Sequence, residues 1–198
     1  MNKMQSLSPV KMLQSICNSQ LELQIRNNVK WTGSLFESVH KLSPDYSGKV
    51  GELLFNQACD AAGMKVNYLG DSNIDAGDGT YDSKVCNVCE KRDEIKTAWQ
   101  GKNGSFQHES LREGGCDQHV FVDIAPNHYY ITILTTFDMR QQHPVMGRKP
   151  HLRKGTTDVY KFDFGENNLK KAIEAGVSIK VDESTTMDQV AEFIRRFH

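Results

Sequence analysis

The spacing of apolar residues predicts one helix followed by a series of strands. Between Ser47 and Gly63, apolar or small side chains recur every three or four positions, as in a helix with one buried face, and Gly63 is a natural end for it. Short runs rich in β-branched and aromatic residues then predict strands. They lie at 65–69, near 81, at 91–99, between 119 and 137 as two strands joined by Pro126 and Asn127, and at 159–164.

Three further helices are predicted. The segment 106–115 ends in two glycines, which favours a short helix there. Towards the carboxyl end the chain predicts helices at 166–176 and 186–197, the second with Thr185 or Thr186 as its cap.

This order of elements predicts a single α/β domain built around a mixed sheet. A chain of 198 residues can bury one core and is short for two. We expect a polar helical segment at 1–46, a core at 47–135, a basic loop at 138–157, and a strand with two helices at 158–198.

Composition narrows the class of protein. Hydrophobic residues make up 38% and charged residues 25%, which is typical of a globular protein, and no apolar run approaches the roughly 18 residues of a membrane span. The amino-terminal sequence does not match a secretory signal, and five cysteines at irregular spacing do not form a disulfide framework, so we expect a cytoplasmic protein. A net charge of −1 disfavours a protein that coats nucleic acid, but it allows a nucleic-acid enzyme whose metal-binding carboxylates offset basic patches.

The candidate chemistry lies in the segment 82–96. On a strand at 91–99, Glu94 and Lys96 share one face and Ile95 points to the other, towards the core. If the segment is a hairpin centred on Val88, Asp82 lies beside Glu94. Two carboxylates next to a lysine suit Mg²⁺, which lowers the pKa of a bound water and stabilises charge on a phosphate. The lysine would orient that water or help to deprotonate it.

These residues resemble the PD-(D/E)XK signature of restriction endonucleases and related DNA-cutting enzymes. Asp82 stands for the first acidic residue, although Tyr81 replaces the usual preceding proline, and Glu94-Ile95-Lys96 stands for the second part of the motif. The order helix, strand, hairpin, helix, strand between 47 and 135 is similar to the core of that superfamily, over about half of the chain.

The resemblance implies a restriction-endonuclease-like fold, a mixed β-sheet flanked by helices, with Mg²⁺ as the cofactor. Asp82, Glu94 and the carbonyl of Ile95 would hold the metal, and Lys96 would handle the water. Glu52, in the preceding helix, matches an additional acidic ligand that supports a second metal or orients the first.

The implied activity is that of a type II restriction enzyme, an endodeoxyribonuclease that leaves 5′-phosphate and 3′-hydroxyl ends. A palindromic duplex target implies a two-fold homodimer, whose interface the segment 1–46 or the carboxy-terminal helices would supply. A DNA repair or junction-resolving nuclease of the same superfamily is an alternative, as is a degenerate nuclease fold kept for interaction.

A basic segment is the main candidate for DNA contact. Between 140 and 154 there are five lysines or arginines and no acidic residue, so this segment would bind phosphates and read base edges, or else be a solvated connection. The candidate contact residues in it are Arg140, Gln141, Gln142, His143, Arg148, Lys149, Arg153 and Lys154.

The loop after the 91–99 strand adds Lys102 and Asn103 as candidate DNA-backbone contacts. Gln107 and His108 follow it, either near the scissile phosphate or in capping and packing roles.

A zinc site is the main rival hypothesis. Cys86 and Cys89, followed by Cys116 and His119, have the spacing of a four-ligand structural site. A zinc-stapled nucleic-acid-binding module would need these four residues and would not need Glu94. The opposing interpretation is that Cys116 and His119 pack at the junction between a helix and a strand.

Overall fold

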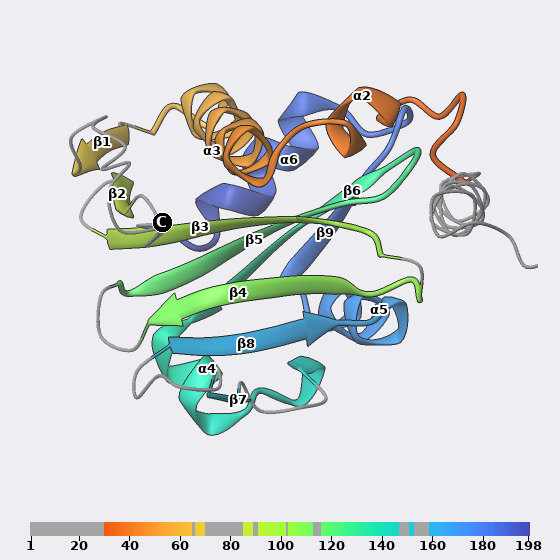
Figure 1. The fold of residues 1–198 in the computed structure, drawn as a ribbon. Helices are drawn as coiled ribbons and strands as arrows, with labels where there is room; N and C mark the ends of the chain where they lie inside the picture. Colours follow the sequence, from red (N-terminus) through yellow and green to blue (C-terminus); the bar gives the residue numbers. More distant parts are fainter. Residues whose placement is uncertain are drawn as a thin grey trace, which may run out of the picture.

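Two β-sheets stacked face to face, with helices over the outer face of the larger one, form one α/β domain (Figure 1). The computed structural model describes residues 30–64, 66–69, 85–88, 91–101, 103–112, 116–146, 151–152 and 159–198.

The larger sheet contains six strands in the order β1-β2-β3-β5-β6-β9. Its strands are β1 Val66–Leu69, β2 Val85–Val88, β3 Lys91–Trp99, β5 Gln118–Ile124, β6 Tyr129–Thr135 and β9 Ser178–Val181. All neighbours are antiparallel except β3 and β5, which are parallel. The sheet is therefore mixed, as the sequence predicts.

The smaller sheet contains three antiparallel strands in the order β4-β8-β7. They are β4 Phe106–Arg112, β7 His151–Leu152 and β8 Val159–Phe164. Because β4 lies in the connection between the parallel strands β3 and β5, this connection passes through the second sheet instead of through the expected helix.

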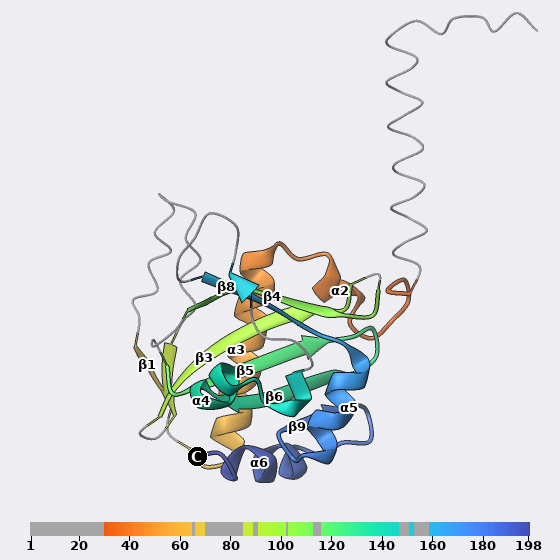
Figure 2. The same ribbon diagram turned by 90° about the horizontal axis from the view of Figure 1, so that it is seen from below.

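Helices cover the opposite face of the larger sheet (Figures 1 and 2). These are α2 Glu37–His40, α3 Pro44–Ala61 and α6 Met187–Arg195. The helix-side cluster is the buried core on this face and includes Trp31, Phe55, Ile95, Val120, Val122, Ile131 and Phe193.

A second core fills the space between the two sheets. This inter-sheet cluster includes Ala98, Phe106, Phe121, Leu134, Phe162 and Phe164, and it extends to α4 Thr136–Gln141, the 3-10 turn Pro144–Met146 and α5 Glu166–Glu174. Strand β5 lies between the two cores, so every one of its residues is buried, and alternate side chains enter different clusters.

Many predicted elements are confirmed. Helix α3 begins three residues before the predicted start at Ser47, and β8 has the predicted bounds. Strand β6 ends two residues before the predicted stretch, and α5 and α6 are the two carboxy-terminal helices. Thr186 caps α6, because its hydroxyl accepts a hydrogen bond from the Gln189 backbone N–H.

The predicted helix at 106–115 is wrong, because this segment forms β4. Phe106 and His108 are buried while Gln107 and Glu109 are exposed, and this period of two is that of a strand. The ladder with β8 shifts register between His108 and Leu111, which brings Leu111 back into the core.

The predicted loop at 138–157 is also only partly a loop. It begins inside α4, continues through the 3-10 turn with buried Val145 and Met146, and includes β7. Arg148, Lys149, Arg153, Lys154 and residues 1–29 lie outside the described residues. Strand β9, which follows Gly176 with its positive φ of 74°, was not predicted.

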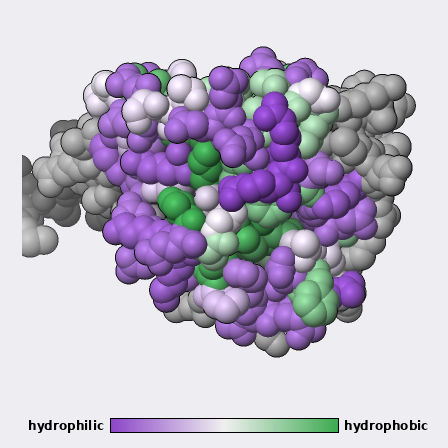
Figure 3. Space-filling model, turned by 180° about the vertical axis from the view of Figure 1, so that it is seen from behind, coloured by the Kyte–Doolittle hydropathy of each residue, from purple (hydrophilic) through white to green (hydrophobic). Residues whose placement is uncertain are grey.

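The surface is mainly hydrophilic, with a central group of hydrophobic side chains on the face seen from behind (Figure 3). Among the described helices, none has the length and apolar character that crossing a membrane requires.

Candidate functional site

The alternation predicted for β3 is confirmed. Ile95 is buried in the helix-side cluster, while Glu94 and Lys96 point to the inter-sheet face that they share with Ala98. The Lys96 ammonium Nζ lies 3.3 Å from Glu94 Oε1. Both side chains are shielded from water, since 4% of Glu94 and 11% of Lys96 is exposed. The Coulomb attraction between the two charges is therefore stronger than in an ion pair on the surface.

The hairpin that was expected to place Asp82 beside Glu94 has a different register. Strand β2 pairs Val85 with Glu94 and Val88 with Lys91, so the hairpin is not centred on Val88. Residues 86–88, predicted as part of the turn, are strand instead, because the ladder with β3 continues to Val88. The alignment of Asp82 with Glu94 is therefore wrong, and Asp82 itself lies outside the described residues.

The parallel ladder brings a histidine to Glu94 instead. Glu94 and His119 are partners in the β3–β5 register, and His119 Nδ1 lies 2.9 Å from Glu94 Oε2. Glu94 thus has Lys96 at one carboxylate oxygen and His119 at the other. From the sequence, His119 was expected to be a zinc ligand or a packing residue. The pair with Glu94 was not predicted, because its geometry depends on which strand lies beside β3.

Cys116 completes a buried three-residue group. Its Sγ lies 3.8 Å from Glu94 Oε2 and 3.6 Å from His119 Nε2. The Thr136 hydroxyl donates to the Cys116 carbonyl oxygen at 2.8 Å and fixes the segment just before β5. Ligand atoms of Glu94, Cys116 and His119 all lie within 4.8 Å of one another.

The thiol of Cys116 is held in its neutral form. Burial, followed by the neighbouring Glu94 charge, raises its pKa to about 11. The thiol is therefore a poor nucleophile at neutral pH, and a metal ion that binds there would have to displace its proton.

The structure does not bring Glu52 into this group. Glu52 lies on α3, where Lys49 Nζ is 3.4 Å from Glu52 Oε2, and α3 covers the Ile95 face of β3. Its carboxylate is not among the three ligand groups that lie together in the described part of the chain.

Two of the four zinc ligands predicted from cysteine spacing have side chains that the structure describes. Cys116 and His119 do meet, as the spacing predicts. Cys86 is the register partner of Asp93 in the β2–β3 ladder. Cys89 lies outside the described residues. Among the described residues, Glu94 is the third member of the group.

A second histidine–carboxylate pair lies deeper between the sheets. His108 Nε2 is 2.8 Å from Asp123 Oδ1, and both side chains are almost fully buried. The Phe121 ring separates the two pairs, with the His119 ring stacked at 6.1 Å and the His108 ring at 4.6 Å. Burial raises the pKa of Asp123 and His108 partly opposes this effect. His108 is therefore a core residue in this structure, whereas the neighbouring Gln107 is exposed.

Other predicted DNA-contacting residues lie at the surface. Asn103 is exposed in the loop before β4, and Lys102 beside it is outside the described residues. Arg140 and Gln141 are exposed at the end of α4. Helix α4 starts beside Cys116, because the Thr136 N–H donates to the Asp117 carbonyl oxygen at 3.0 Å, so the basic segment begins at the Glu94 end of the sheet.

Gln142 and His143 connect α4 to the 3-10 turn Pro144–Met146. Gln142 adopts a left-handed conformation with φ 56° and ends α4. His143 Nδ1 accepts the Val145 N–H at 3.4 Å. The His143 side chain is half-buried.

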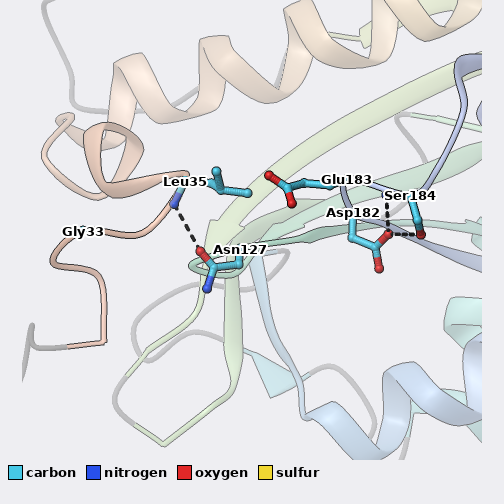
Figure 4. A pocket seen from close by; sticks show the side chains of 6 residues that line it. All are labelled: Gly33, Leu35, Asn127, Asp182, Glu183 and Ser184. Atoms are coloured by element: carbon cyan, nitrogen blue, oxygen red, sulfur yellow. Dashed lines mark hydrogen bonds between the residues drawn. The ribbon is translucent and has the colours of Figure 1, made fainter.

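An open cavity of about 510 Å³ lies at the other end of β5, near the turn to β6 (Figure 4). Polar groups on its rim bond within the rim: Asn127 Oδ1 accepts the Leu35 N–H at 3.1 Å, and Asp182 Oδ1 accepts the Ser184 N–H at 3.1 Å. None of the predicted site residues lines it.

The sequence therefore predicts Glu94, Lys96 and the approach of Cys116 to His119, but not the ladder that unites them. No protein-family model, curated protein or solved structure matches this chain.

Proposed function

We propose that this protein is a Mg²⁺-dependent, sequence-specific endodeoxyribonuclease of the type II restriction class. The observation that carries the proposal is the arrangement of β3, which presents Glu94 and Lys96 on one face, 3.3 Å apart, and buries Ile95 on the other. A hairpin with β2, a parallel neighbour in β5 and a helix packed on β3 support the resemblance to the PD-(D/E)XK core.

The donor set supports Mg²⁺ through Glu94. A carboxylate is the ligand type that Mg²⁺ prefers, and the carbonyl of Ile95 and the carboxylate of Asp82 are the further oxygen ligands that the motif implies. Bound Mg²⁺ would lower the pKa of a water and offset charge on the phosphate. Glu94 would hold the metal, and its ion pair with Lys96 would keep that ammonium at the reacting phosphodiester, where it orients the water.

The exposed end of α4 supports double-stranded DNA as the partner. Arg140 and Gln141 are accessible there, and the chain continues into the basic segment that includes Arg148 and Lys149. The proposed enzyme acts as a homodimer, because two-fold symmetry of the protein matches that of a palindromic DNA site. A repair or junction-resolving nuclease of the same superfamily is the alternative, and it would differ from a restriction enzyme in the DNA shape that it recognises.

One observation favours a second candidate function. The approach of Cys116 to His119 supports a zinc-stapled binding module without catalysis, in which zinc would stabilise the fold.

Cleavage of a long duplex of diverse sequence tests the first proposal. We expect discrete fragments with Mg²⁺, none with a chelator, and a loss of at least about a hundredfold for Lys96→Ala. Lys161→Ala is the matched control and should cut like the wild type, since Lys161 lies on β8 in a surface pair with Glu109.

Three other outcomes would count against the proposal. Intact DNA with a folded protein would overturn it, and full activity of Lys96→Ala would remove that residue from the site. A smear in place of discrete fragments would replace sequence specificity by non-specific or shape-selective cleavage.

A further inference from the structure

We propose that Glu94, Cys116 and His119 bind a soft divalent transition metal of the Zn²⁺ class, and that this metal competes with Mg²⁺ for Glu94. The metal site itself does not depend on the nuclease function. Its consequence, inhibition of DNA cleavage by Zn²⁺, rests on the proposed nuclease function.

Two of the three distances between the ligands already fit a tetrahedral site. Zn–S, Zn–N and Zn–O bonds of about 2.3, 2.0 and 2.1 Å at tetrahedral angles place the sulfur about 3.6 Å from each other ligand, and the nitrogen about 3.4 Å from the oxygen. In the structure, Cys116 Sγ lies 3.7 Å from His119 Nδ1 and 3.8 Å from Glu94 Oε2. Only the His119 Nδ1 to Glu94 Oε2 separation, 2.9 Å, must widen for a metal to replace the hydrogen between them.

The chemistry of the ligands selects the metal. Thiolate and imidazole suit Zn²⁺ and related ions, whereas Mg²⁺ and Ca²⁺ take oxygen ligands. Three protein ligands leave a fourth position open, as in zinc sites that also bind water or another ligand.

Neighbouring side chains hold the ligands in place. Lys96 contacts Glu94 Oε1, the carboxylate oxygen that the soft metal would not bind. The Thr136 hydroxyl fixes the backbone at Cys116. His119 stacks on Phe121 with an interplanar angle of 17°, which limits rotation of its ring. The site therefore needs little reorganisation to accept a metal.

Glu94 belongs to both proposed centres, so one metal excludes the other. When the carboxylate is bound to a soft metal together with Cys116 and His119, it is drawn towards the start of β5 and away from Mg²⁺. Zn²⁺ should therefore inhibit cleavage in the presence of Mg²⁺, and removal of Zn²⁺ by a chelator selective for it should restore the rate.

Titration of the metal-free protein with Co²⁺ tests the site without reference to DNA. Co²⁺ bound to a thiolate absorbs in the near ultraviolet, and we expect this band at one Co²⁺ per chain, with Zn²⁺ abolishing it. Cys116→Ser should remove the band and weaken Zn²⁺ binding at least about tenfold. Cys59→Ser is the matched control and should retain the band, because Cys59 is buried on α3 in the helix-side cluster.

Two results of the titration would overturn the site. One is the absence of a thiolate band in the wild-type protein. The other is a band that persists in Cys116→Ser. Loss of the band in a Cys86→Ser/Cys89→Ser variant would replace the three-ligand site by the four-ligand zinc site.

Cleavage assays test the competition separately. The cleavage rate of each protein is compared with its own rate without Zn²⁺. We expect the Zn²⁺ concentration that halves this rate to be at least about tenfold lower for the wild type than for Cys116→Ser. If the protein binds Co²⁺ through Cys116 but cuts no DNA, the nuclease proposal fails and the metal site stands. If it cuts DNA and Zn²⁺ bound at Cys116 has no effect, the competition is overturned.

Discussion

Two histidine–carboxylate pairs lie between the sheets, and they differ in what surrounds them. The Glu94–His119 pair has Lys96 and Cys116 as polar neighbours, while His108 and Asp123 lie among aromatic rings. Asp123 Oδ2 and His108 Nδ1 have no hydrogen-bond partner in the described part of the chain. The second pair therefore depends on its single contact of 2.8 Å.

We expect His108→Leu to destabilise the protein by about 3–5 kcal/mol, because it leaves the Asp123 carboxyl buried without a partner. Urea unfolding measures this loss. Gln107→Leu, the neighbouring and exposed position of β4, is the matched control and should change the free energy of unfolding by less than about 0.5 kcal/mol. Equal effects of the two substitutions would contradict the role assigned to the pair.

The same variant has a predictable pH dependence. Burial raises the pKa of Asp123 above 3.8, so over the range between 3.8 and the folded pKa the folded state binds more protons than the unfolded state, and stability falls as pH rises. His108→Leu removes the group that opposes this shift. Its deficit relative to the wild type should therefore be larger at about pH 7 than at about pH 5. A deficit that shrinks as pH rises would mean that Asp123 is not the source.

Sequence alone could predict which face Glu94 and Lys96 share, since alternation along a strand is local. It could not predict that His119 meets Glu94, because that contact depends on the parallel register of β3 and β5. The predicted pairing of Asp82 with Glu94 failed for a related reason, because Val85 is the register partner of Glu94 and a shift of register changes every pairing in a hairpin.

Among the elements, β4 was the most difficult to predict. Its buried and exposed residues alternate only over Phe106–Glu109, after which the register shift interrupts the pattern, and the glycines that follow favour a helix end. Pairing with β8, about 50 residues away in sequence, decides its structure, which is a tertiary effect that overrides local pattern.

Contact between α3 and β3 depends on Gly51. A Cβ there would lie 1.8 Å from Thr97 Oγ1 and 3.0 Å from Thr97 Cβ, so Gly51→Ala must push the helix away from the strand that carries Glu94. We expect a loss of about 1–3 kcal/mol in urea unfolding. Gly48→Ala is the matched control, because nothing lies within 4 Å of its Cβ, and it should gain up to about 1 kcal/mol of helix propensity.

Thr97→Ala provides the decisive comparison. Combined with Gly51→Ala it removes the clashing hydroxyl, so the double variant should recover part of the loss and show a coupling between the two positions. Strictly additive effects would contradict direct contact between Gly51 and Thr97.

At the scale of the whole molecule, the class of fold could be predicted but its layers could not. The order of elements indicated one α/β domain with a mixed sheet, which is correct. The second sheet was missed because the sequence of a strand such as 118–124, which is buried on both faces, does not show whether a helix or a strand covers each face.

The two cores share strands, and this predicts that the molecule unfolds as one unit. Strand β5 places Val120 and Val122 in the helix-side cluster and Phe121 in the inter-sheet cluster. The loss of either layer therefore exposes the strands on which the other is built. Trp31 and Trp99 are the only tryptophans, and both lie on the helix side, so their fluorescence reports on that layer alone.

We expect tryptophan fluorescence and far-ultraviolet circular dichroism to give the same urea midpoint. Phe162→Ala makes the test sharper, because this ring is buried in the inter-sheet cluster on β8, on the far side of the sheet from both tryptophans. It should cost about 3–5 kcal/mol and lower the midpoint equally for both probes. If the fluorescence midpoint stays in place while the dichroism midpoint falls, the smaller sheet unfolds on its own. The Glu94 cluster would then lose its cover before the helix layer opens.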